Sequence, residues 1–289
     1  MTENYILELF NKAFANYDPL APLTLMFLFL ARMLPIIALA PFLGARVAPH
    51  PVKMALGIAL FVLFAPLLVT ETTIHLTFSS YTVLLIIKEF FIGLILGFII
   101  SLPFVIVQNA GIIIDHQRGG ASLMVNDPTV QNQSSPLGTL FNMVMIYIFY
   151  VGIKGVDGVS IFFNAILHSY EVIPPDQFFS DYFFQKGTPF WKVLMELFNK
   201  IMVLSIEMAT PGLLIILMTD FFLGIINRLA PQVQITFLGM PLKSLLALAI
   251  ITLGWHVYTD QFAKDSIKWT EYLYTIINMF DVGKAPIAP

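Results

Sequence analysis

The sequence of 289 residues contains no cysteine. Without a thiol the chain can form no disulfide bond, no thiolate nucleophile and no cysteine-ligated metal site. Charge is also scarce, because only 11% of the residues are Asp, Glu, Lys or Arg, whereas a soluble domain averages about 25%. The net charge of −3 offers no basic surface to nucleic acid. We therefore expect no disulfide framework and no nucleic-acid partner.

The sequence also lacks the short motifs of common enzymes. It has no GxxxxGK[ST] phosphate-binding loop, no GxSxG nucleophile elbow and no HExxH metalloprotease motif. Its five histidines are scattered, and no two stand four residues apart as a metal-binding pair on a helix would. We therefore expect no catalytic residue, no metal site and no cofactor.

Hydrophobic residues, by contrast, make up 58% of the chain, and the mean hydropathy is +0.83. Three runs carry no charged residue at all, namely 54–70, 90–114 and 128–153. A helix that crosses a bilayer needs roughly 20 apolar residues. Segments with the long alternating pattern of transmembrane barrels are missing. The sequence therefore predicts an all-α membrane protein.

Proline interrupts most of the apolar segments. The prolines inside them are Pro35, Pro41, Pro66, Pro103 and Pro211. Each removes one backbone hydrogen bond from a helix and crowds the preceding turn. In lipid the freed carbonyl group would be costly unless neighbouring protein or a watery cavity satisfied it. We therefore predict broken helices that pack against other protein.

Charged residues also stand inside these segments, where they normally face a bundle interior, a pore or a partner. They are Lys88, Glu89, Glu207, Asp220, Arg228 and Lys243. We predict that Lys88 pairs with Glu89 or with the charge of a partner. Asp220 has two candidate partners, Arg228 and Lys243. Asp220 and Arg228 are eight residues apart, too far to pair within one helix, so pairing between helices or between subunits is favoured.

A proton relay is another use for these carboxylates. Carboxylates inside apolar segments carry protons in pumps and transporters, and Glu89, Glu207 and Asp220 are the candidates in this chain. This alternative would make the protein a proton-coupled membrane transporter of a small solute.

Gly93 and Gly97 form a GxxxG motif inside an apolar run. The motif removes side chains from one helix face, so that another backbone can approach closely. Ordinary variation along a helix is the alternative explanation, because the motif is common by chance. We retain helix packing as the prediction for both glycines.

The polar connection 115–136 combines two uncommon features. It contains RGG (118–120), where glycine permits tight folding. It also contains LMV (123–125), a short apolar patch inside a polar segment. Exposed apolar patches usually bind something, so this connection is a candidate contact site; a solvated loop with one buried anchor is the alternative.

Three segments resemble the FliR/SctT family, which supplies the R subunit of the flagellar export gate and the T subunit of type III secretion injectisomes. They are ARMLPIIALAPFLG (31–44), GIIIDHQRG (111–119) and DFFLGIINRLAPQVQITFLGMPLK (220–243). The most specific element runs from Asn227 to Gln232. APFLGARVAPHPVK (40–53) and EVIPPDQFF (171–179) are closer to injectisome T proteins, the chlamydial type in particular. Val233-Gln234 replaces a pair that is often Leu-Asn in flagellar forms, which also favours the injectisome.

The resemblance implies an architecture of helical hairpins, in which a P/R-type and a Q/S-type export-gate subunit are fused. Residues 1–190 would be the P/R-like part, 191–260 the Q/S-like hairpin and 261–289 a C-terminal tail. The chain would be a subunit of the inner-membrane export gate, partly raised into the periplasmic basal body. It would help to form the entry channel for unfolded secreted proteins, without being an enzyme.

The partners that the resemblance implies are several copies of the FliP/SctR and FliQ/SctS subunits, the FlhB/SctU switch protein, the FlhA/SctV export-gate ring, and needle or rod components. The loop that matches the family's plug, about 111–126, would hang into the channel. We assign this plug to Asp115, Arg118, Gly119, Gly120 and Met124. Subunit interfaces are assigned to Glu207, Asp220, Asn227, Arg228, Pro231, Gln232, Gln234 and Lys243.

Overall fold

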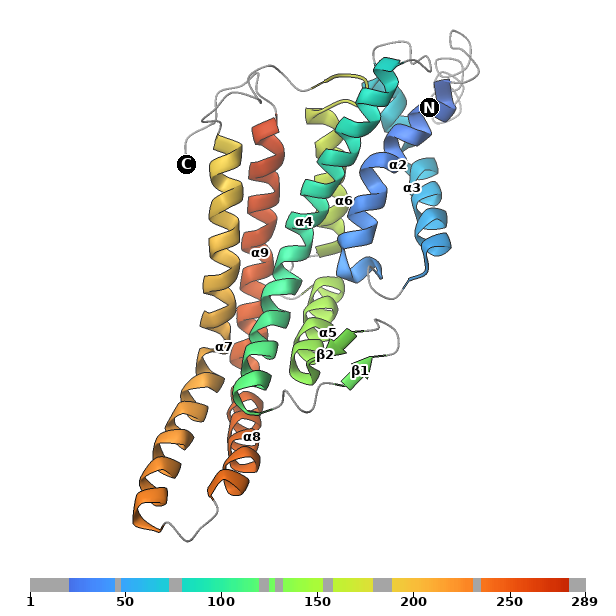
Figure 1. Ribbon diagram of the computed structural model, residues 1–289. Coiled ribbons are helices and arrows are strands. Elements are labelled where there is room, and N and C mark those ends of the chain that lie inside the picture. Colours follow the sequence, from blue (N-terminus) through green and yellow to red (C-terminus); the bar gives the residue numbers. More distant parts are fainter. Residues whose placement is uncertain are drawn as a thin grey trace. The chain divides into compact units, whose positions relative to one another are not determined.

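Helices account for most of the structure, a computed structural model that describes residues 21–44, 48–72, 80–119, 125–127, 132–152, 158–178, 189–230 and 235–280 (Figure 1). In chain order they are α2 (Ala21–Leu39), the 3₁₀ helix η1 (Pro41–Leu43), α3 (His50–Glu71), α4 (Ser80–Gln117), α5 (Pro136–Val151), α6 (Gly158–Val172), α7 (Pro189–Leu229), α8 (Ile235–Leu253) and α9 (Trp255–Phe280). The predicted all-helical class is confirmed for every long element of these ranges.

A short β-ribbon adds to this helical architecture. Strands β1 (Val125–Asp127) and β2 (Asn132–Ser134) pair antiparallel between α4 and α5, with Asn126 opposite Gln133. Strands of three residues are too short to show an alternating sequence pattern. The sequence therefore marked this connection as unusual without indicating a ribbon.

The prolines lie within continuous helices. Pro35, Pro66, Pro103 and Pro211 stand inside α2, α3, α4 and α7, while Pro41 begins η1. A proline removes only its own N–H bond, and the remaining bonds of a long helix carry the chain past it. The sharp bend occurs instead at Gly254, where the axes of α8 and α9 differ by 63°.

Helix α9 continues through residues 261–280, within the segment predicted as a C-terminal tail. The side chains that this part of α9 buries are Phe262, Ala263, Trp269, Leu273, Ile276 and Ile277. They recur at helical spacing and form one apolar stripe. Lys264 and Lys268 between them are exposed, and the mixed signs of the charges in this stretch obscured the stripe in the sequence.

The chain forms two compact units that alternate along the sequence. Unit 1 comprises 1–101, 160–193 and 270–289, and unit 2 comprises 102–159 and 194–269. The predicted boundary near residue 190 separates a part that resembles P/R-type subunits from a part that resembles Q/S-type subunits. This boundary stays a prediction.

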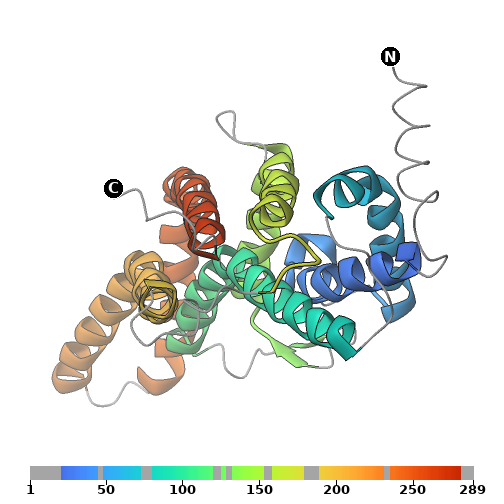
Figure 2. The same ribbon diagram turned by 90° about the horizontal axis from the view of Figure 1, so that it is seen from above.

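In unit 1, α2 lies beside α3, as Figures 1 and 2 both show. Phe29 is central to this packing, with its ring 5.6 Å from that of Phe64 and 5.8 Å from that of Tyr170. On the other side α2 meets α4, where a Cβ atom added to Gly93 would lie 2.2 Å from the carbonyl oxygen of Arg32. At Gly97 it would lie 3.0 Å from the Ile36 Cα atom. The two glycines therefore lie where the backbones of α2 and α4 approach closely.

In unit 2, α4 and α5 make a similar close approach. A Cβ atom added to Gly111 would lie 2.5 Å from the backbone of Gly138. Phe141 of α5 packs against α9, with its ring 5.5 Å from the rings of both Tyr258 and Phe262. Helices α7 and α8 follow one another in the chain and form a hairpin (Figure 1).

Four of the described helices, α2, α3, α4 and α7, are long and apolar enough to cross a membrane. A fifth span results if α8 and the start of α9 count as one bent segment. Length and composition therefore support a multi-pass membrane protein.

We expect Gly93→Ala to destabilise unit 1, because the new methyl group would meet the Arg32 carbonyl group rather than a movable side chain. Overpacking of this kind costs typically about 1–3 kcal/mol. Gly224→Ala is the matched control, since nothing lies within 4 Å of the added atom, and alanine favours a helix over glycine. The measurement is the midpoint of heat-induced aggregation in isolated membranes. Equal midpoints for the two variants would contradict the close approach.

Candidate functional site

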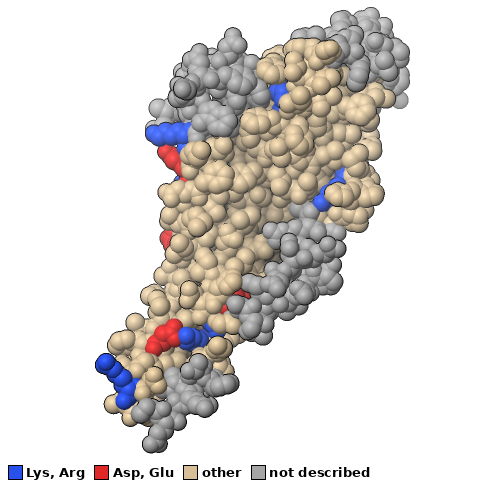
Figure 3. Space-filling view, viewed as in Figure 1, with Lys and Arg blue, Asp and Glu red and all other residues tan. Residues whose placement is uncertain are grey.

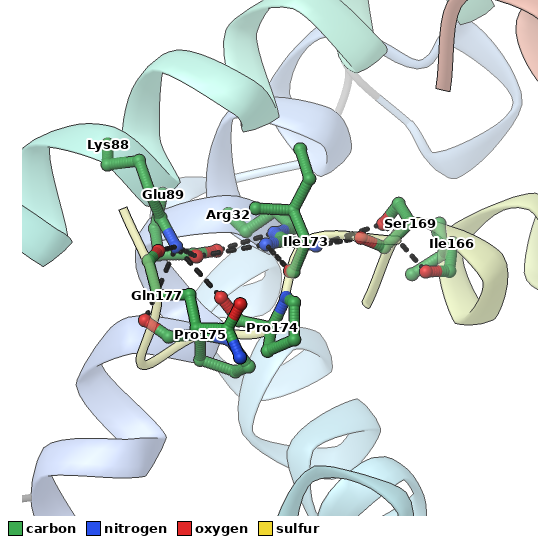
Figure 4. Close-up of polar contacts among 9 residues, drawn as sticks. All are labelled: Arg32, Lys88, Glu89, Ile166, Ser169, Ile173, Pro174, Pro175 and Gln177. Atoms are coloured by element: carbon green, nitrogen blue, oxygen red, sulfur yellow. Dashed lines mark hydrogen bonds and ion pairs between the residues drawn. The ribbon is translucent and has the colours of Figure 1, made fainter. Parts of the chain in front are cut away.

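A buried ion cluster in unit 1 joins Arg32 of α2 to Lys88 and Glu89 of α4 (Figure 4). The Arg32 guanidinium binds the Glu89 carboxylate through two bonds, Nε to Oε2 at 2.5 Å and Nη2 to Oε1 at 2.9 Å. The Lys88 ammonium lies 2.7 Å from Glu89 Oε1. All three side chains are fully buried. One carboxylate therefore serves two cations, and the predicted pairing of Lys88 with Glu89 is present.

The remaining donors of the two cations bind the end of α6 (Figure 4). Arg32 donates to the carbonyl oxygens of Ser169 and Ile173, each at 2.9 Å. Lys88 donates to those of Pro174, Pro175 and Gln177, at 3.0, 3.3 and 2.7 Å. The last carbonyl groups of a helix have no partner within the helix, and cations are favourable there. The ion cluster thus fixes the end of α6 and the segment that follows it.

Tyr170 completes the surroundings of Arg32. Its ring centroid lies 3.9 Å from the Arg32 Cζ atom, a cation–π contact. Burial raises the pKa of Tyr170, so its phenol stays protonated and supplies no counter-charge. Glu89 is therefore the direct anionic partner of Arg32. Arg32 was not among the residues predicted from the sequence, although it is a lone charge in the apolar run 21–39, a signal of the kind that identified Lys88 and Glu89.

A second polar cluster, the loop base, lies in unit 2 and consists of Asp115, Arg118, Ser135, Leu137 and Ser244. Asp115, near the end of α4, accepts from Arg118 Nε at 2.7 Å, from the Leu137 N–H at 2.9 Å and from the Ser135 hydroxyl group. Ser135 in turn caps α5 by accepting from the Gly138 N–H at 3.0 Å. A carboxylate is favourable at a helix N-terminus. Asp115 therefore joins the two ends of the connection that carries the β-ribbon.

The plug residues predicted from the resemblance fall into two groups. Asp115 and Arg118 are buried, with exposures of 2% and 7%, and their polar atoms are engaged within unit 2. Gly119 follows with a left-handed φ of +87°, a conformation that favours glycine. Gly120 and Met124 lie outside the described residues. The structure thus places the first two at the base of the connection.

The hairpin of α7 and α8 carries the charges predicted at subunit interfaces. Asp220 of α7 pairs with Lys243 of α8, so of the two candidates the partner is Lys243 and the pair joins two helices. Glu207, Asn227 and Arg228 are exposed on α7. Pro231, Gln232 and Gln234 lie outside the described residues. The described interface candidates are therefore partly paired within the chain and partly open at its surface.

Large apolar side chains surround these charges on the hairpin surface. They are Leu214, Leu217, Met218, Phe221, Phe222 and Ile225 on α7, and Leu242, Leu245, Leu248 and Leu253 on α8. On the face shown in Figure 3, charged side chains are few and neutral residues dominate. A surface of this kind is covered by lipid or by protein. Glu207 and Asp220 disfavour lipid, since charge inside a bilayer is expensive.

No group of three or more His, Asp or Glu side chains that could hold a metal ion occurs among the described residues. The ion cluster and the loop base join helices within each unit, and the hairpin of α7 and α8 carries an exposed apolar surface. Their chemistry is hydrogen bonding and charge pairing between helices.

We expect Lys88→Met to destabilise the chain strongly. Removing one partner from a buried ion pair typically costs about 3–5 kcal/mol, and this change also leaves three carbonyl groups without the Lys88 donor. Lys192→Met is the matched control, because Lys192 is exposed on α7. The heat-aggregation midpoint in membranes should fall for Lys88→Met alone. A midpoint equal to that of the control would show that the ion cluster does not stabilise the fold.

Comparison with known proteins identifies the family of this chain. The chain matches the model of the bacterial export proteins, family 1, over residues 23–267. The Yop proteins translocation protein T of Yersinia pestis is 30% identical over 187 residues, which cover 62% of this chain and 66% of that protein. The surface presentation of antigens protein SpaR of Shigella flexneri is 28% identical over 223 residues, covering 76% and 80%. The flagellar biosynthetic protein FliR of Bacillus subtilis is 28% identical over 204 residues, covering 70% and 75%.

The matched range contains the ion cluster, the loop base and the hairpin of α7 and α8. It also contains the segments 31–44, 111–119 and 220–243 that suggested the family from the sequence. Because the family model spans most of the chain, this protein belongs to the bacterial export proteins of family 1, the FliR/SctT family.

Proposed function

We propose that this chain is a subunit of the export apparatus of a bacterial type III secretion system, and that it helps to form the entry channel for unfolded secreted proteins. The observation that carries the proposal is the family match over residues 23–267. Relatives named for translocation of Yop proteins and for flagellar biosynthesis both support an export apparatus. The injectisome-like segments 40–53 and 171–179 favour the virulence branch.

The exposed hairpin surface supports assembly with other subunits. Its exposed apolar side chains must be shielded from water by lipid or by protein. Glu207 and Asp220 disfavour lipid, because a charged side chain inside a bilayer carries a high free-energy cost. Helices of sister subunits can cover both kinds of residue, because they supply apolar side chains and counter-charges together. We assign this role to copies of the P/R-type and Q/S-type subunits. The FlhB/SctU switch protein, the FlhA/SctV ring and needle or rod components are the further proposed partners.

The inner membrane of the bacterium is the proposed location, with part of the assembly raised into the periplasm. The loop of about 111–126 is the proposed plug, in which Gly120 and Met124 would contact the channel. Asp115 and Arg118 support this role, because they hold the two ends of the connection 115–136 together.

The proton-coupled transporter finds less support in the geometry. Asp220 is paired with Lys243, and Glu89 is bound by Arg32 and Lys88. Glu207 and Asp220 lie 13 residues apart on one helix, a rise of about 20 Å. Protons do not pass directly over such a distance between two carboxylates. A relay would need groups other than these three.

Co-expression tests the proposed function. The chain alone should aggregate in detergent, because its apolar hairpin surface is uncovered. Together with the P/R-type and Q/S-type subunits of the same organism it should purify as one defined complex, measured by affinity pull-down and size-exclusion chromatography. A stable, monodisperse chain that retains neither subunit would contradict the proposal.

Glu207→Gln separates the export subunit from the transporter. Glu207 lies near the middle of the apolar stretch 192–229, so we expect a partner cation opposite it. Neutralising Glu207 would leave that cation unpaired, at a typical cost of about 3–5 kcal/mol, and should reduce the co-purified subunits. Glu196→Gln, at an exposed position near the start of α7, is the matched control. An intact complex combined with lost uptake of a solute would favour the transporter instead.

A further inference from the structure

Within the loop base, the Arg118 side chain binds Ser244 of the hairpin helix α8. Its Nε atom donates to Asp115 Oδ1 at 2.7 Å, and its Nη1 atom donates to the hydroxyl oxygen of Ser244 at 2.8 Å. The guanidinium group is planar and its N–H groups point in fixed directions. Two bonds from different nitrogens therefore fix the plane, and with it the distance between the end of α4 and helix α8.

A second contact lies directly beside this bond. The α-carbon of Gly119 faces Met240 of α8, where an added Cβ atom would lie 3.4 Å from the Met240 side chain. Met240 and Ser244 are one helical turn apart, so they lie on the same face of α8. Arg118 and Gly119 thus meet a single turn of that helix.

The same turn of α8 is also tied to α7. Lys243 precedes Ser244 and forms the ion pair with Asp220. On the other side, Asp115 binds both Arg118 and the start of α5, so the two ends of the β1–β2 connection are held at one point. The path from hairpin to ribbon therefore runs through Ser244, Arg118 and Asp115.

We infer that Arg118 is a positioning residue that fixes the β1–β2 ribbon to the α7–α8 hairpin through its hydrogen bond to Ser244. The displacement of α8 by a docked subunit would then be transmitted to the ribbon. The bond between Arg118 and Ser244 does not depend on the proposed function. Its role in secretion, however, rests on the proposed function. Asp115 holds the two ends of the connection together, whereas Arg118 sets where this connection lies relative to α8.

The chain contains no cysteine, so two spin labels can be attached at Asn126→Cys in β1 and at Ala249→Cys in α8. The distance between them is measured by pulsed electron paramagnetic resonance in membranes that contain the full chain without partners. Ser244→Val removes the hydroxyl group. Ser244→Thr keeps the hydroxyl group in a side chain of nearly the same volume as valine. We expect the distance distribution to broaden and shift for Ser244→Val, and to remain narrow for Ser244→Thr.

Ser205→Ala is the matched control elsewhere in unit 2, because the Ser205 hydroxyl group donates only to its own helix, at the Ile201 carbonyl oxygen. Ser244→Ala is the second variant if valine prevents accumulation of the chain. Equal distributions for Ser244→Val, Ser244→Thr and the parent would overturn the inference, as would an equal broadening by Ser205→Ala. The pull-down described above tests the proposed function separately, since the distance measurement needs no partner.

Discussion

One carboxylate, that of Glu89, neutralises the two cations buried in the interior of unit 1. In an interior with few polar groups, a cation is stable only beside an anion and with its other donors satisfied. Arg32 and Lys88 meet both conditions by sharing Glu89 and by donating to carbonyl groups at the end of α6 and in the segment that follows it. The same bonds satisfy a helix terminus that would otherwise lack partners. Helices α2, α4 and α6 are thereby joined by directional bonds rather than by apolar contact alone.

In unit 2 a charged side chain again binds the end of a helix, but the charge is negative and the end is an N-terminus. Asp115 places a negative charge at the start of α5 and satisfies the Leu137 N–H, while Arg118 balances that charge. Each unit thus uses charged side chains of one helix to satisfy the end of another. The hairpin differs, because Glu207 and Arg228 stay exposed beside large apolar residues. Such a surface is consistent with a subunit whose remaining polar partners belong to other chains.

The sequence predicted the class of fold and several contacts for physical reasons that are local. Long charge-free runs predicted helices of membrane-spanning length, and the adjacent charges of Lys88 and Glu89 predicted their ion pair. Arg32 was missed although it is a lone charge in an apolar run, and its ion pair could not be predicted because Glu89 lies 57 residues away. The helix through residues 261–280 was also missed, since its apolar stripe is thin and is interleaved with charges of both signs. The prolines were expected to break helices, but the flanking hydrogen bonds kept those helices continuous.

By itself the sequence determined composition, hydropathy and the segments that identify the FliR/SctT family, because these properties belong to residues close together in the chain. Only the tertiary structure decided which polar groups far apart in the sequence meet. Asp220 selects Lys243 over Arg228, and Arg118 reaches Ser244 across 126 residues. Such choices depend on how helices approach one another, and this approach follows from packing at positions such as Gly93 and Gly111. Backbone contacts at glycine set the distances, and the charged side chains then bind what lies within reach.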